Sequence, residues 1–351
     1  MTKMLMKGNE AIAEAAIRSG CKLFFGYPIT PSTEIPEYMS KKLKEVGGTF
    51  LQAESEVAAI NMVYGASATG VRVMTASSSP GYSLKQEGLS YLAAVELPAV
   101  IVDIMRAGPG LGGLGPTQAD YFQITKGGGH GDYHPIVLAP ATVQEMVDLT
   151  MEAFDLADEY RTPVVIAADG ILGQMMEPVE FPKGSSKDLP HKDWAATGAK
   201  GREKVNVSNY CLTNEIGERN CLHLQKKHEY IKPRVQRWKS YKTEDAEFII
   251  VAFGTSGRIS ETAVDLARKE GIKLGLIRPI TLWPFPEKAF EGILDQVKGF
   301  MSVELSTGQM IEDVRLVVNG KVPVKFFGKQ GGMTPAPEEI VTSFKAQFGL
   351  E

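Results

Sequence analysis

The segment Gly26-Tyr27-Pro28-Ile29-Thr30-Pro31-Ser32 follows a short apolar run, Leu23-Phe24-Phe25, that predicts a buried strand. Each of the two prolines fixes its own φ and favours an extended conformation in the residue before it. Thr30 is therefore expected in a stiff turn at the end of a strand, where open α/β sheets bind their ligands. The alternative is an ordinary strand-to-helix turn in which Ser32 or Thr33 is the helix N-cap.

The composition indicates a globular protein of two domains. The chain has 351 residues, which is too long for one ordinary core, and 43% of them are hydrophobic and 23% charged. A formal net charge of −4 gives no electrostatic reason to expect binding to nucleic acid or to an anionic membrane. The N-terminus does not resemble a signal peptide, and no apolar stretch is long enough to cross a bilayer. A cytoplasmic protein is expected.

The three cysteines, Cys21, Cys211 and Cys221, have no C-x-x-C spacing. An iron–sulfur cluster usually needs four thiolates, so we expect no cluster held by this chain alone. The cysteines near His223 and His228 match no common zinc spacing, and we expect no metal site.

Strands and helices alternate from residue 9 to about residue 181. Apolar runs predict strands at 22–26, 49–53, 71–75, 98–105, 134–139 and 163–168, and helical spacing predicts helices at 9–19, 35–44, 57–68 and 142–159. This alternation is typical of a parallel sheet with helices on both faces. It predicts a first doubly wound α/β domain, residues 1–181.

A polar stretch, residues 182–245, separates this domain from a second alternating unit. It predicts a wrapping linker with one helix from Leu222 to Ile231, which Pro233 ends or kinks. Residues 246–351 predict a smaller doubly wound α/β domain. Its expected strands are 248–253, 273–277, 301–305 and 323–327, and its expected helices are 260–270, 287–298, 310–318 and 338–348.

The glycine-rich run Gly110 to Gly115 matches the G-x-G-x-x-G pattern of dinucleotide sites. In such a site a helix begins at once, so that its N-terminal amides face the pyrophosphate. Here Pro109 precedes the run, Pro116 follows it, and the next residues are not helix-periodic. We interpret the run as a lid or packing loop.

Two charged residues are placed where chemistry could occur. Glu56 begins a helix of small apolar residues, so it is either a favourable acid at a helix N-terminus or a buried carboxylate that shares a proton with a bound heterocycle. Glu54 is the rival acid. Arg106 ends an apolar strand, where it could bind a carboxylate ligand or form a salt bridge with Asp103 or Asp120.

Four segments, in this order, resemble a known family: Tyr27 to Ser32, Glu54-Ser55-Glu56, Thr75 to Gly81, and Arg106. The family is the thiamine-diphosphate-dependent 2-oxoacid:ferredoxin oxidoreductases, and the likeness is to the alpha-type subunit with the pyrimidine-binding domain. The later run Leu276 to Pro286 resembles the transketolase C-terminal-like domain of that subunit. The segments 118–123 and 125–133 look most like the branched-chain, 2-oxoisovalerate (3-methyl-2-oxobutanoate) type.

The resemblance implies roles for the matching residues. Glu56 would hydrogen-bond N1′ of the cofactor's aminopyrimidine, which promotes loss of the proton from the thiazolium ring. Thr30 and Arg106 would bind the substrate carboxylate. The cofactor-binding set would be Tyr27, Pro28, Ile29 and Glu56, with no metal ligand in this chain.

The family's other parts are absent from the sequence. It has no G-D-G…N motif for a Mg²⁺-bound diphosphate and no cysteine set for clusters. The resemblance therefore implies an obligate hetero-oligomer in which thiamine diphosphate is shared with a diphosphate-binding beta-type subunit. Gamma-type and ferredoxin-like subunits would complete it, and Mg²⁺ and the [4Fe-4S] clusters would lie on the partners.

The implied reaction converts a 2-oxoacid, CoA and oxidised ferredoxin to acyl-CoA, CO₂ and reduced ferredoxin. Three alternatives stay open. A 2-oxoglutarate enzyme would need a further cation near the pocket, such as Arg72 or Lys126. The chain could instead be a non-catalytic assembly subunit in which Glu56 only stabilises a helix, or a nicotinamide-dependent dehydrogenase.

Overall fold

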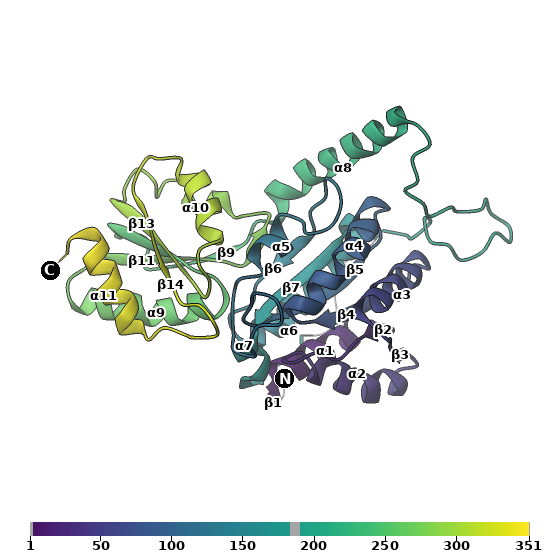
Figure 1. Cartoon of the computed structure of the whole chain (residues 1–351), viewed down its shortest axis with the longest axis horizontal. Helices are drawn as coiled ribbons and strands as arrows, with labels where there is room; N and C mark the ends of the chain where they lie inside the picture. Colours follow the sequence, from purple (N-terminus) through teal and green to yellow (C-terminus); the bar gives the residue numbers. More distant parts are fainter. Residues whose placement is uncertain (1–2, 183–189, 351) are drawn as a thin grey trace.

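Two α/β sheets organise the chain in the computed structural model, which describes residues 3–182 and 190–350 (Figure 1). Each sheet is parallel except for one antiparallel strand at its edge. The α/β class with parallel sheets, which the alternation of strands and helices predicts, is therefore confirmed.

The first sheet has the strand order β12-β6-β7-β5-β4-β2-β3. Its strands β4, β5 and β7 are buried along their whole length, as their continuous apolar runs predict. The six parallel strands are β2 (Leu23–Gly26), β3 (Thr49–Gln52), β4 (Val73–Ser77), β5 (Ala99–Met105), β6 (Ile136–Leu138) and β7 (Pro163–Asp169).

Two groups of helices pack against this sheet (Figure 1). In one group α1 (Gly8–Arg18) packs on α2 (Glu34–Glu45) and α6 (Val143–Tyr160). In the other, α3 (Glu56–Ala68) packs on α4 (Ser79–Ala94). The helices therefore place the starts of α3 and α4 side by side at the carboxyl edge of the sheet, where ligands bind in open α/β folds.

The second sheet has the order β14-β13-β10-β11-β9. The helices α9 and α11 pack on one another, and α10 contacts β13 and β14. The strands are β9 (Trp238–Tyr241), β10 (Phe248–Val251), β11 (Leu274–Pro279), β13 (Gly299–Glu304) and β14 (Val324–Gly328), and the helices are α9 (Gly254–Lys269), α10 (Met310–Val318) and α11 (Pro337–Phe348).

Two strand pairings join segments far apart in the sequence, and sequence analysis missed both. β12 (Thr281–Trp283) follows the second sheet's β11 but pairs antiparallel with β6 of the first sheet. β1 (Met4–Lys7) pairs antiparallel with β8 (Met176–Val179), so the beginning and end of the first domain are held together.

The helix predicted over 287–298 is wrong. Only a short 3-10 helix, η1 (Glu287–Phe290), forms there, and turns follow it. Gly292 has a φ of 76°, a left-handed conformation that interrupts a helix. The apolar residues Ile293 and Leu294 pack against the core from these turns, which is why their pattern resembled a helix.

The stretch after the first domain contains a longer helix than predicted. α8 spans Asn214–Val235 and contains Pro233, whereas the sequence indicated Leu222 to Ile231 with an end or kink at the proline. Pro233 lies in the last turn of α8, two residues before the helix ends at Val235. Residues 183–189 of this predicted linker lie outside the described residues.

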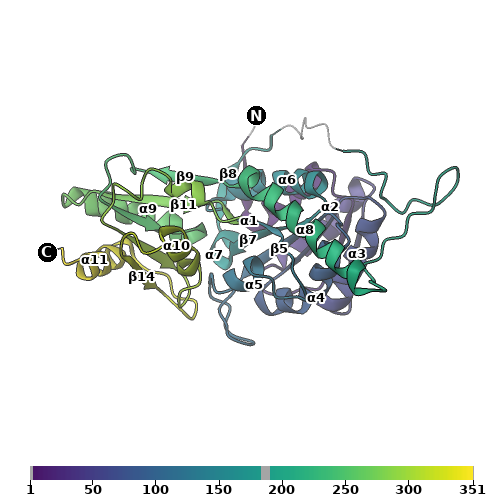
Figure 2. The same cartoon turned by 90° about the horizontal axis from the view of Figure 1, so that it is seen from above.

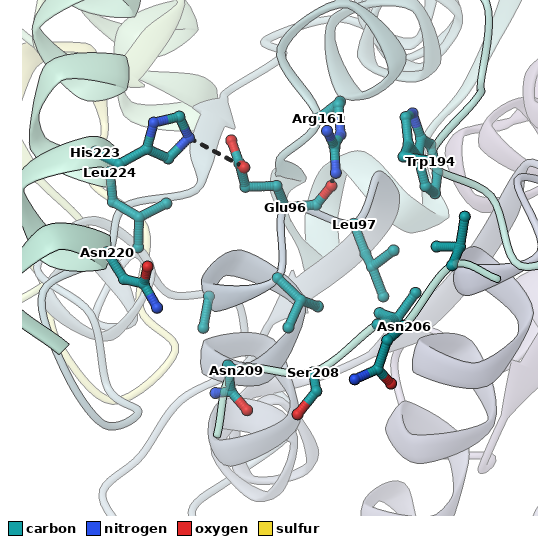
Figure 3. A pocket seen from close by; sticks show the side chains of 14 residues that line it. Glu96, Leu97, Arg161, Trp194, Asn206, Ser208, Asn209, Asn220, His223 and Leu224 are labelled. Carbon is teal, nitrogen blue, oxygen red and sulfur yellow. Dashed lines mark hydrogen bonds and ion pairs between the residues drawn. The ribbon is translucent and has the colours of Figure 1, made fainter. Parts of the chain in front are cut away.

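Figure 2 shows α8 lying across the first domain, and hydrogen bonds attach it there. The His223 ring nitrogen lies 3.1 Å from a Glu96 carboxylate oxygen, and the Arg161 guanidinium lies 4.9 Å from the centre of the Trp194 ring. These side chains surround a pocket of about 250 Å³ (Figure 3). The pocket contains none of the residues that sequence analysis assigns to chemistry.

Candidate active site

The turn that contains Thr30 connects β2 to α2 and is held by its own hydrogen bonds. The Ser32 backbone N–H and hydroxyl both donate to the Ile29 carbonyl, at 2.9 and 2.8 Å. Asn9 Nδ2 donates to the Pro31 carbonyl at 2.7 Å, which ties the turn to α1. Thr33, at the N-cap of α2, makes no capping hydrogen bond through its side chain, so the turn is not explained as a simple helix cap.

Glu56 lies at the first position of α3 and is only 6% exposed. Ser55 is the N-cap, and its hydroxyl accepts the Ala58 N–H at 3.2 Å. A Cβ atom on Gly81 would lie 2.6 Å from Glu56 Oε1, so the carboxylate lies directly against the start of α4. The rival acid Glu54 is exposed. Of the two acids, only Glu56 is buried.

The buried polar groups around Glu56 are unusually poor in hydrogen-bond partners. Native proteins pair nearly all such groups, so an accumulation of unpaired ones indicates a site completed by another molecule. None of the described residues donates a hydrogen bond to the Glu56 carboxylate. The other buried atoms without a partner in this part of the structure are Thr75 Oγ1, Ser77 Oγ, Ser78 Oγ, Tyr82 Oη, Lys85 Nζ, Asp103 Oδ2 and Arg106 Nε.

Arg106 brings two predicted substrate residues together. Its Nη1 donates to the Thr30 carbonyl at 2.9 Å, and its Nη2 donates to the Leu111 carbonyl at 3.1 Å. The alternative, a salt bridge to Asp103 or Asp120, does not form: the guanidinium has only carbonyl partners among the described residues. Within residues 3–182 and 190–350, no carboxylate therefore pairs with the Arg106 guanidinium.

A cleft of about 600 Å³ opens at Arg106 between the two domains. The first domain contributes Ser79, Arg106 and Asp120, and the second contributes Ser306, Gln309 and Gln330. Glu56, Thr30, Tyr27, Pro28 and Ile29 do not line this cleft. The structure therefore brings Thr30 next to Arg106 and Glu56 next to the start of α4. Both groups lie at the carboxyl edge of the first sheet.

The glycine-rich run makes packing contacts and does not lead directly into a helix. The Ala107 N–H donates to the Gly115 carbonyl, and the Gly113 N–H donates to the Ala107 carbonyl, both at 2.8 Å. A Cβ on Gly115 would lie 2.6 Å from the Gly332 Cα atom, so the two domains meet there backbone to backbone. The next helix, α5, begins only at Tyr121 (Tyr121–Thr125), which removes the geometry of a dinucleotide site.

Three polar residues of this edge were given no site role by sequence analysis: Ser79, Lys85 and Asp103. Asp103 was considered only as a possible salt-bridge partner of Arg106, and Lys85 gave no signal because a lysine on a helix is ordinarily exposed. In the structure both are buried. Lys85 lies on α4, which packs on α3, and Asp103 lies on β5, which α4 also contacts; local sequence does not specify this packing.

The chain matches two family descriptions. Residues 14–241 match "Pyruvate flavodoxin/ferredoxin oxidoreductase, thiamine diP-bdg", and residues 246–340 match "Pyruvate:ferredoxin oxidoreductase core domain II". Together the two matches account for both sheets.

Relatives of known name are similar along almost their whole length. The chain is 52% identical to the ketoisovalerate oxidoreductase subunit VorB of Methanothermobacter marburgensis, over 95% of this chain and 94% of the relative. It is 37% identical to the 2-oxoglutarate synthase subunit KorA of the same organism, over 96% of each.

Solved structures extend the comparison to the fold. A 2-oxoglutarate:ferredoxin oxidoreductase from Magnetococcus marinus, solved with 2-oxoglutarate, coenzyme A and succinyl-CoA bound, superposes with a TM-score of 0.86 at 28% identity. It matches 99% of this chain, which spans 65% of the length of that chain. A split-gene transketolase superposes with a TM-score of 0.62 at 13% identity, a likeness of fold alone.

Proposed function

This chain belongs to the pyruvate flavodoxin/ferredoxin oxidoreductase family, and we propose that it is the pyrimidine-binding subunit of a CoA-dependent enzyme for branched-chain 2-oxoacids. The enzyme would oxidise 2-oxoisovalerate to an acyl-CoA and CO₂ and pass two electrons to ferredoxin. The observation that carries the proposal is the buried Glu56 carboxylate, which lies among unpaired hydroxyls at the start of α4.

The residues around Glu56 fit the aminopyrimidine of thiamine diphosphate. A carboxyl group with no donor from its own chain can hold a proton against a ring nitrogen, and neighbouring hydroxyls can serve the exocyclic amine. When bound, this cofactor supplies the ring that adds to the 2-oxo carbon and accepts the electron pair as CO₂ leaves. Glu56 would hold the proton at N1′, and Tyr27, Pro28 and Ile29 would contact the rest of the cofactor.

Thr30 and Arg106 would hold the substrate carboxylate. The guanidinium is a planar fork that suits a carboxylate, and no acid in the described part of the chain competes for it. Its role would be mainly to position the substrate, because the carboxylate charge departs with CO₂ and gains little in the transition state.

A branched-chain substrate is favoured over 2-oxoglutarate because the two candidate cations are already paired. Arg72 Nη2 and Nε donate to Asp155 at 2.7 Å and Asp158 at 2.8 Å. Lys126 forms an ion pair with Asp313. Neither is free to bind the second carboxylate of 2-oxoglutarate.

The rest of the active site would come from partner subunits. The sequence has no diphosphate motif, and the described residues contain no cluster of three or more potential metal-ligating His, Cys, Asp or Glu side chains. A beta-type subunit would bind the diphosphate and Mg²⁺, and gamma-type and ferredoxin-like subunits would complete the path to ferredoxin with [4Fe-4S] clusters.

The test is Glu56→Gln in the complex assembled with its partners, with Glu54→Gln as the matched control. We expect Glu56→Gln to lower kcat at least about 100-fold, the usual loss for a positioned proton donor, without loss of assembly. Glu54→Gln should retain wild-type turnover because its carboxylate is exposed. Equal turnover of both variants would support the assembly-subunit alternative, and turnover of 2-oxoglutarate in preference to 2-oxoisovalerate would overturn the substrate assignment.

No described helix combines the length and apolar character needed to cross a bilayer.

A further inference from the structure

Lys85, on α4, is buried although its charged group has no hydrogen-bond partner. The residue is 1% exposed, and its Nζ atom makes no hydrogen bond to any described residue. A buried ammonium in this state is costly, because it loses its hydration and gains no acceptor in return. A cost of this kind indicates a functional role for the side chain more than a structural one.

The packing of α4 on α3 directs Lys85 toward Glu56 (Figure 1). Gly81, Lys85 and Gly88 lie on one face of α4, because they follow the helical i, i+4, i+7 spacing. A Cβ on Gly81 would lie 2.6 Å from Glu56 Oε1. A Cβ on Gly88 would lie 2.5 Å from Ile60 Cγ2, so the whole face contacts α3. Long side chains of a helix extend back toward its N-terminus, which carries the Lys85 ammonium toward Gly81 and Glu56.

The electrostatics of Lys85 agree with this direction. Burial lowers the pKa of the Lys85 ammonium to about 8, and the charge of Glu56 acts in the opposite sense. The attraction between the two groups is mutual, and little water screens it because both side chains are buried. Lys85 and Glu56 are therefore opposite charges that face one another across the contact between α3 and α4.

The other titratable groups on the elements that contact α4 are bonded elsewhere or uncharged. On β5, Asp103 accepts a backbone N–H from the start of α4 at 3.0 Å. On β7, Asp169 accepts two N–H groups at the start of α7 (Gly170–Gln174). Burial raises the hydroxyl pKa of Tyr82, on α4, and of Tyr64, on α3, so both are neutral. Of the carboxylates on α3, β5 and β7, only the one on α3 accepts no hydrogen bond from a described residue.

We propose that Lys85 is a positioning residue for the proton that Glu56 exchanges with the aminopyrimidine ring. Its ammonium is the counter-charge that keeps the Glu56 carboxylate ionised before the cofactor binds. An ionised Glu56 accepts a hydrogen bond from the ring nitrogen and leaves the proton there, whereas a protonated Glu56 keeps the proton and donates it. This inference rests on the proposed function, because it takes Glu56 as the group at N1′.

The inference predicts how many protons are taken up when thiamine diphosphate binds. If Glu56 is ionised beforehand, the proton between Glu56 and N1′ must come from solvent, so binding takes up about one proton near pH 6.5. Without Lys85, burial favours the neutral form of Glu56, which then supplies this proton itself.

The experiment compares wild type with Lys85→Met, which keeps the length of the side chain and removes its charge. Calorimetry of thiamine diphosphate binding, with Mg²⁺ present, is performed on the cofactor-free assembled complex at pH 6.5. Buffers with different ionisation enthalpies give the number of protons exchanged, and any exchange by the diphosphate is common to all variants. We expect Lys85→Met to take up about one proton fewer than wild type. Lys85→Gln should behave like Lys85→Met and serves if that variant does not assemble.

The pH dependence and a matched control test the same point. Because the pKa of Lys85 is about 8, wild-type Lys85 is also neutral at pH 10, and the difference between wild type and Lys85→Met should disappear there. Lys41, on α2, is exposed, so Lys41→Met should take up as many protons as wild type.

The inference is overturned if Lys85→Met takes up as many protons as wild type at pH 6.5, or if the difference persists at pH 10. Glu56→Gln, which cannot ionise, separates this outcome from failure of the proposed function. If Glu56→Gln keeps the wild-type proton uptake, Glu56 is not the group at the ring nitrogen and the proposed function fails. If Glu56→Gln loses the uptake while Lys85→Met follows wild type, only the role of Lys85 fails.

Discussion

Two buried glutamates lie near the starts of helices in the two domains, and their surroundings are opposite. Glu304 ends β13 of the second sheet and accepts hydrogen bonds from the Ser302 and Ser306 hydroxyls and from the N–H groups of Gln309, Met310 and Ile311. Glu56 of the first domain has no donor among the described residues. A carboxylate saturated by its own chain stabilises the fold, whereas an unsaturated one is available to a ligand.

The largest effect should come from the ligand-facing edge. Arg106→Ala should lower kcat/KM for 2-oxoisovalerate at least about 100-fold, equal to ~2.7 kcal/mol, because a desolvated cation that pairs with a carboxylate is removed. Steady-state kinetics of the assembled complex measure it. Arg106→Lys keeps the charge but not the planar fork and should recover only part of the loss. Full activity of Arg106→Ala would show that this edge does not bind the carboxylate.

The saturated glutamate should affect stability instead. Glu304→Gln replaces one acceptor oxygen by an amide NH₂ group, a donor that would face donors at the start of α10, which should cost about 2–3 kcal/mol. The thermal midpoint of the assembled complex measures this loss. At temperatures where the complex remains folded, KM should be unchanged. An unchanged midpoint would remove the distinction between the two glutamates.

The fold and the site were predictable from sequence to different degrees. Strands such as Val164 to Ala168 are continuous apolar runs, and a buried parallel strand needs nothing more than such a run. The Thr30 turn and Arg106 were proposed as site residues because their residue types are unusual at strand ends. The hydrogen bonds that join Ser79 to Asp103, Asp120 and Arg106 were not predicted. They connect residues far apart in the sequence, and no local pattern indicates such contacts.

Replacing Lys85 should have a smaller effect, on stability, and tests whether the buried polar groups at this edge of the sheet are unpaired. It is 1% exposed, its ammonium has no partner among the described residues, and burial lowers its pKa to about 8, against the attraction of Glu56. Lys85→Met removes an unpaired buried charge and should raise stability by about 1–2 kcal/mol at pH 7.

The sign of the pH dependence follows from the lowered pKa. Between pH 8 and the ordinary lysine value the unfolded chain binds a proton that the folded chain does not, so wild-type stability rises with pH there. The advantage of Lys85→Met in thermal midpoint should therefore shrink as pH increases from 8 to 10. An advantage that grows with pH would show that Lys85 is paired in the assembled complex.

The smallest effect is expected for the stability of Glu56→Gln. Since no hydrogen bond from a described residue is lost, the free energy of unfolding should stay within about 0.5 kcal/mol of wild type, as for an ordinary surface substitution. Thermal unfolding of the assembled complex measures it. A drop comparable to that of Glu304→Gln would mean that Glu56 is a structural acid after all.

The crossing of β12 into the first sheet has a practical consequence for dissecting this polypeptide. A fragment cut at residue 245 would keep every strand that forms the parallel sheet but leave the outer side of β6 with unpaired N–H and C=O groups. Such a bare margin is a template for self-association. The boundary at residue 245 therefore does not separate two independent folding units. Neither fragment is a promising candidate for crystallisation or assay by itself.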